Sequence, residues 1–168
     1  MTSFRNIIAI AFLLLACIAC QSRKEPITLL QEQLKQDSIA LDRMQDNYQD
    51  RLQADFLWCD SMLQYAKKDD VNEYFDILNL AQAYLRQFNE MLPVMRHDHA
   101  FIRQQLSDLQ YDLDNKHIND SLFSIYLSDE AASADTLHNR VLYFQDRLSS
   151  QDQALQSLKK SICKAESK

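Results

Sequence analysis

The stretch LNLAQAYLRQFNEMLPVMRHDHAFIRQQLSDLQYDL, residues 78–113, decides the fold. Its apolar residues recur at alternating steps of three and four, the spacing that lines one face of a helix. Pro93 lies inside this run, and a proline usually ends or kinks a helix. The apolar phase is nevertheless unchanged across Pro93, which two independent helices would share only by chance. We therefore predict one kinked helix over residues 70–116, and we keep open the alternative of two shorter helices broken at Pro93.

The same periodicity extends over two flanking segments, residues 27–67 and 119–163. In the first of these segments, two consecutive steps of four around Leu52 indicate a local phase slip. Both connections place lysine before aspartate, as KKDD at 67–70 and KHIND at 116–120. Lysine suits the negative end of one helix and aspartate the positive start of the next. We therefore expect two helix-to-helix turns built without glycine.

The three periodic segments have nearly matched lengths, each about 60 to 70 Å at 1.5 Å per residue. Matched helices joined by short turns pack in antiparallel fashion. The sequence therefore predicts an all-α protein, with residues 27–165 folding as an elongated antiparallel three-helix coiled-coil-like bundle. The alternative is a shorter four-helix bundle broken at Pro93.

The composition excludes several classes of protein. The chain has no glycine and two prolines, so the glycine-rich loops that bind nucleotides are absent and a sheet protein with tight turns is disfavoured. Its formal net charge is −6, without a basic stripe, which argues against nucleic-acid binding. No nucleophile, base, metal set or phosphate loop is recognisable, so we expect no enzymatic activity and no cofactor.

The N-terminal residues read as an export signal. Arg5 precedes the apolar run IIAIAFLLLACIA, 13 residues from Ile7 to Ala19. A membrane-spanning helix needs about 20 apolar residues, whereas a signal peptide has a basic start and a shorter apolar core. The run ends in a small residue followed by cysteine, first as LLLAC (13–17) and again as CIAC (17–20), before the polar QSRK.

This ending resembles the lipobox of bacterial lipoproteins. The resemblance implies that residues 1–19 are a signal peptide and that Cys20 is acylated at the new N-terminus. Cys17 is the alternative, with residues 1–16 as the signal peptide, because Leu14 precedes it in the favoured position. Two or more acyl chains anchor a protein stably. Residues 20–26 would be a lipidated linker that keeps the bundle within about 20 Å of the membrane.

The resemblance also implies a place in the cell. With Gln21 after Cys20, and without a run of acidic residues there, lipoprotein sorting implies the outer membrane of a diderm bacterium, facing the periplasm. The chain as a whole is similar to small lipoproteins of Bacteroidetes. We expect the membrane as one partner, through the lipid, and a protein of the cell envelope as another.

Few residues of the body suggest a site. His97 and His99 are two positions apart and diverge on a helix, so we predict no metal site. Together with Trp58, they are candidates for an interaction surface. Cys59 and Cys163 lie toward the same end of a three-helix bundle, and an exported protein can form disulfides, so a Cys59–Cys163 bridge is possible.

These features favour a helical structural or protein-interaction module held at the membrane. The alternative is a periplasmic binding module that holds a peptide or small ligand between helices. That alternative requires a groove lined by aromatic residues near Pro93.

Overall fold

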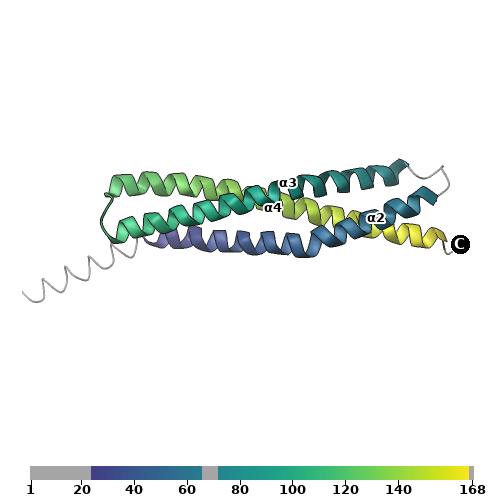
Figure 1. Ribbon diagram of the computed structural model, residues 1–168, viewed down its shortest axis with the longest axis horizontal. Helices are drawn as coiled ribbons and strands as arrows, with labels where there is room; N and C mark the ends of the chain where they lie inside the picture. The colour runs from purple at the N-terminus through teal and green to yellow at the C-terminus, as the bar shows by residue number, and fades with distance from the viewer. Residues whose placement is uncertain (1–23, 66–71, 167–168) are drawn as a thin grey trace, which may run out of the picture.

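The computed structural model describes residues 24–65 and 72–166. Residues 24–44 are α-helical and continue into the π-helix η1 (Gln45–Gln49) and the helix α2 (Asp50–Tyr65), forming one rod, here the N-terminal rod. The other two rods are α3 (Asn72–Asp114) and α4 (Asp120–Glu166). Figure 1 shows the three rods side by side along nearly their whole length. Among the described helices, none is both long enough and apolar enough to cross a membrane.

The prediction of an all-α three-helix bundle is confirmed. Pro93 lies inside the continuous helix α3, so the alternative with a break at this residue is wrong. Pro93 is exposed, while its neighbours Leu92 and Met95 are buried on the seam. Proline lacks the N–H that would bond the Asn89 carbonyl, but this loss falls on the solvent side of the helix. The core-facing side of α3 therefore continues across Pro93.

The rods alternate in direction. Lys24 pairs with Asp114 and Arg96 with Asp42, so α3 runs antiparallel to the N-terminal rod. The N-terminal rod and α4 run parallel, because residues 101 positions apart in the sequence meet repeatedly along the two rods.

The core is a single seam of apolar side chains that runs the length of the bundle. Its members recur with the heptad spacing of coiled coils. They are Ile27, Leu34, Leu41, Met44, Leu52, Cys59, Leu63, Leu78, Ala81, Leu85, Phe88, Leu92, Met95, Ile102, Leu106, Leu109, Phe123, Ala134, Leu137, Val141, Phe144, Leu148, Leu155, Leu158 and Ile162.

The predicted phase slip coincides with η1. Buried positions along the N-terminal rod step by seven from Asp37 to Met44, by eight from Met44 to Leu52, and by seven from Leu52 to Cys59. A π-turn holds one more residue than an α-turn. η1 therefore absorbs the extra residue and returns the seam to the core.

The turn between α3 and α4 closes without glycine. Lys116 adopts a left-handed conformation with φ 57°, the N–H of His117 donates to the carbonyl of Asp112, and that of Lys116 to Leu113. This is the Schellman arrangement in which glycine is the commonest left-handed residue. Asn119 then caps α4, because its Oδ1 accepts from the N–H of Leu122. The second predicted turn, at 67–70, lies outside the described residues.

Candidate functional site

The predicted acylation sites, Cys17 and Cys20, lie outside the described residues. The structure does show where the chain after them enters the bundle. The ammonium of Lys24 lies 2.6 Å from Asp114 Oδ1, at the end of the bundle where α3 passes into α4. The hydrogen bond from Lys24 lowers the pKa of Asp114 below its ordinary value of 3.8. We call this end the near end.

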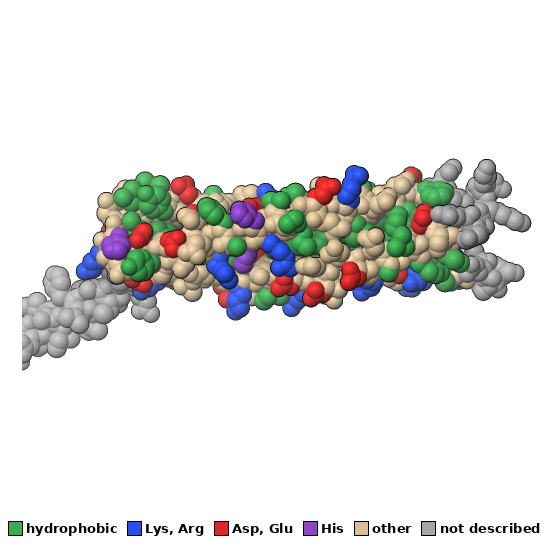
Figure 2. Space-filling view, viewed as in Figure 1, with side chains coloured by type: hydrophobic (Ala, Val, Ile, Leu, Met, Phe, Trp, Pro, Cys, Tyr) green, Lys and Arg blue, Asp and Glu red, His purple; other side chains and the backbone are tan. Residues whose placement is uncertain are grey.

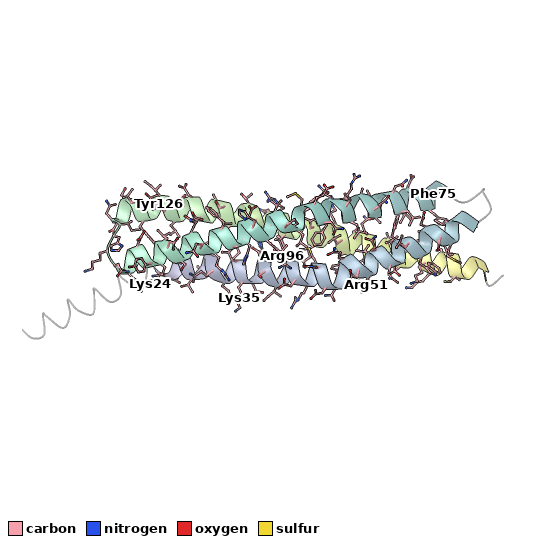
Figure 3. All side chains as sticks on the ribbon, viewed as in Figure 1. Lys24, Lys35, Arg51, Phe75, Arg96 and Tyr126 are labelled. Atoms are coloured by element: carbon pink, nitrogen blue, oxygen red, sulfur yellow. The ribbon has the colours of Figure 1, made fainter. Side chains whose placement is uncertain are left out.

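Apolar side chains gather on the surface of the near end. Leu122, Ile125 and Tyr126 are 40%, 53% and 47% exposed and lie within one turn of α4. We call these three residues the near-end patch. Figure 3 labels Tyr126 and Lys24 at this same end, and Figure 2 shows apolar side chains clustered there. Tyr111 and Leu29, on the other two rods, are also exposed near this end.

His97, His99 and Trp58 do not form one surface. His99 is half-buried, and its Nε2 donates to the carbonyl of Leu34 at 2.9 Å, so it joins α3 to the N-terminal rod. His97 is exposed on α3. Trp58 lies farther along the bundle beneath Lys159, whose Nζ is 5.2 Å from the ring centre. The three residues therefore lie at separate places on the bundle, and their contact with a partner stays a prediction.

A hydrogen bond to a buried carboxylate was not predicted from the sequence. Asp37 is 2% exposed, and its Oδ1 accepts from His138 Nδ1 at 2.7 Å, across 101 residues of sequence. Its Oδ2 is buried without a partner, as is Nε2 of Gln33, one turn earlier on the same helix. The signal in the sequence was a polar residue, Asp37, at an otherwise apolar seam position.

A groove of about 420 Å³ opens beside this pair, between the N-terminal rod and α4. Asp37 and His138 share its lining with apolar Met44 and Leu142 and with the cationic Arg43. The groove therefore combines apolar walls with one buried carboxylate and one exposed cation.

A second buried carboxylate lies toward the opposite end of the bundle, here the far end. Asp55 accepts from Lys159 Nζ at 2.7 Å and from Gln156 Nε2. The hydrogen bond to Asp55 raises the pKa of Lys159. The neighbouring thiol of Cys59 is buried, and loss of solvation raises its pKa from 9.0 to about 11. Such a thiol is protonated at neutral pH, which makes it a poor nucleophile.

The predicted Cys59–Cys163 bridge is not formed. Both are free thiols, Cys59 buried and Cys163 exposed. Cys59 occupies a seam position, whereas Cys163 follows the seam residue Ile162 and lies on the outer side of α4. The two cysteines do reach the same end of the bundle, but their side chains face different directions around it.

A groove near Pro93 lies between α2 and α3 and has a volume of about 600 Å³. It is lined by Phe56 and otherwise mainly by polar residues, including Gln53, Gln82, Arg86 and Asn89. The binding-module alternative called for several aromatic residues here, and one is present. Over residues 24–65 and 72–166, no three histidine, cysteine or carboxylate side chains converge as metal ligands.

Comparison with known proteins adds no relative. No protein family, no curated protein and no solved structure matches this chain.

Proposed function

We propose that this protein is a membrane-anchored envelope lipoprotein whose three-helix body is a structural or protein-interaction module. The observation that carries the proposal is the N-terminal sequence, in which 13 apolar residues end in Ala19-Cys20 and turn polar at Gln21. A run of this length is too short to span a bilayer but suits the apolar core of an export signal.

The body supports an interaction or structural role rather than a catalytic one. Its buried polar residues, Asp37 and Asp55, are engaged with α4. The groove between α2 and α3 is lined mainly by polar residues, and the buried thiol of Cys59 has a raised pKa. An elongated rod held by one end offers long side surfaces to neighbouring proteins.

Mass spectrometry of the mature protein tests the anchor. The full chain is expressed in a diderm bacterium, and its N-terminal peptide is compared among wild type, Cys20→Ala and Cys17→Ala. We expect the wild-type peptide to begin at acylated Cys20, Cys17→Ala to be unchanged, and Cys20→Ala to lose the acyl chains and the membrane association.

The matched pair of cysteine variants separates the outcomes. Acylation lost only in Cys17→Ala assigns the lipid to Cys17 and moves the signal peptide to residues 1–16. A mature chain without acyl chains contradicts the lipoprotein proposal altogether.

Crosslinking in intact envelopes tests the role of the body. We expect a specific envelope protein to be captured by the acylated wild type. Recovery of no specific protein partner would count against the interaction module and would leave the groove between α2 and α3 as the reason to test peptides and small ligands.

A further inference from the structure

The three residues of the near-end patch are 40% to 53% exposed in the described part of the bundle. Leu122, Ile125 and Tyr126 are spaced i, i+3 and i+4, so they lie together on one side of α4. Phe123, between them, is buried in the core, which leaves the patch on the outer side. Other exposed apolar residues include the adjacent pair Leu142 and Tyr143 farther along α4. Phe75 and Leu80 on α3 are five positions apart and point to different sides.

We propose that the near-end patch rests on the surface of the bilayer and is a second, non-covalent contact of this protein with lipid. The proposal builds on the acylated cysteine of the proposed function. Contact through the patch would orient the body of the protein on the membrane.

The N-terminal rod begins at the same level of the bundle as the near-end patch. The offset of 101 residues between the N-terminal rod and α4 places Lys24 level with Ile125. Cys20 is four residues before Lys24, so its Cα lies within about 14 Å of that of Lys24 even in a fully extended chain. An anchor at Cys20 therefore holds the patch close to the bilayer, and Cys17 would extend the reach to about 25 Å.

The size of the patch favours lipid over a soluble partner. A stable protein interface buries about 800 Å² on each side, from 20 to 30 residues, whereas this patch has three residues. A weak contact becomes effective when a tether raises the local concentration of its partner. The bilayer is the partner that the anchor supplies at such a concentration, and tyrosine is enriched at the membrane–water interface.

Charged residues of both signs lie near the patch. The nearby charged residues of α4 are Asp120, Asp129 and Glu130, all acidic, and the first basic residue of α4 is Arg140. Lys24, level with Ile125, and Lys116, in the turn before α4, add basic groups at the same end of the bundle. The contact therefore rests on apolar side chains and should form on zwitterionic phosphatidylcholine.

Quenching of tryptophan by brominated acyl chains measures the contact. The acylated full chain carrying Tyr126→Trp is reconstituted in vesicles of brominated phosphatidylcholine, with unbrominated vesicles as the reference. The matched control is Tyr143→Trp, an exposed tyrosine of α4 that lies about 25 Å farther along the helix. Native Trp58, level with Lys159 and about 50 Å from Tyr126, is the common background in both variants.

We expect bromolipid to quench the added emission about two-fold for Tyr126→Trp, and to leave Tyr143→Trp and the wild type unchanged. Equal quenching at both positions, or none at Tyr126, overturns the inference. Emission of Tyr126→Trp that shifts with protein concentration instead of bromolipid would assign the patch to a second copy of the chain.

Separate measurements test the acylated anchor and the lipid contact of the patch. Loss of acylation in the mass spectrum contradicts the proposed function. An acylated, vesicle-bound chain whose Tyr126→Trp reporter is not quenched contradicts only the lipid contact.

Discussion

At the scale of single residues, two buried carboxylates set the register of the bundle. Asp37 and Asp55 lie at buried positions of the N-terminal rod, and each takes its partner from α4. Apolar seams that repeat every seven residues would also pack after a slip of one heptad. Such a slip would separate Asp37 from His138 and Asp55 from Lys159, and buried polar residues are known to specify register in coiled coils.

Removing His138 tests the first of these pairs. We expect His138→Ala to lower the free energy of unfolding by about 1 to 3 kcal/mol, because Asp37 stays buried without its donor. The double variant Asp37→Leu, His138→Leu should be as stable as the wild type or more so, since an apolar pair needs no hydrogen bond. Urea unfolding followed by circular dichroism measures both, and equal losses in the two variants would contradict this account.

The two cysteines of the body should differ sharply in reactivity. We expect a maleimide at pH 8 to label exposed Cys163 in the folded protein and to reach buried Cys59 only after unfolding. Peptide mapping after labelling checks this difference.

Burial raises the pKa of Cys59 from 9.0 to about 11, so the folded state holds the thiol proton more tightly than the unfolded state. The resulting stabilisation is complete below pH 9 and is lost between pH 9 and 11. Cys59→Ala checks this expectation, because the variant should lose the dependence of stability on pH between 9 and 11.

At the scale of elements, η1 explains how the N-terminal rod keeps its core face. The step of eight between Met44 and Leu52 would rotate a regular helix away from the core, and the π-turn restores the phase. In α3 the spacing is regular throughout, and no such adjustment is present within Asn72–Asp114.

Deleting one exposed asparagine from the N-terminal rod, and in a second variant one from α3, tests whether η1 holds an extra residue that α3 lacks. Without Asn47, inside η1, the N-terminal rod becomes a regular α-helix with the same seam, so we expect the melting temperature to change by no more than about 5 °C. Without Asn79, α3 has no extra residue to lose, and the deletion turns one part of its seam by about 100° relative to the other. Thermal unfolding should therefore show a loss of cooperative folding for the Asn79 deletion alone. Similar losses in both would contradict the role of η1.

At the scale of the whole molecule, the bundle is a long rod with two different ends. The near end holds Lys24, the turn at Lys116 and the near-end patch, and the far end holds Trp58, Cys59 and Cys163. If the chain is anchored at Cys20, the far end stands away from the bilayer unless the bundle tilts. Partner contacts would then spread along the sides of the rod.

The length of the rod predicts its behaviour in solution. α4 has 47 residues and is therefore about 70 Å long, which sets the maximum dimension of the folded body. Small-angle scattering of the detergent-solubilised chain, with the detergent contrast-matched, should give a particle of this length. A much shorter particle would contradict the three-helix bundle.

Much of the fold was predictable because helical periodicity is a local property. The unchanged phase across Pro93 identified one long helix, and the two steps of four around Leu52 located the irregularity that the structure resolves as η1. The sequence did not show that His97 and Trp58 lie at different positions along the bundle, because this depends on how the rods pack. The predicted disulfide is not formed for a related reason. The sequence indicated that both cysteines lie toward the same end of the bundle, but it did not show that Cys163 faces outward from α4.

The sequence by itself determined the number, length and order of the helices, since apolar spacing, proline position and turn charges act within a few residues of one another. Only the tertiary structure decided which polar residues meet, because Asp37 and His138 are 101 residues apart and the packing of whole rods sets their register. The same register brings Lys24 level with Ile125, which places an apolar patch beside the predicted anchor.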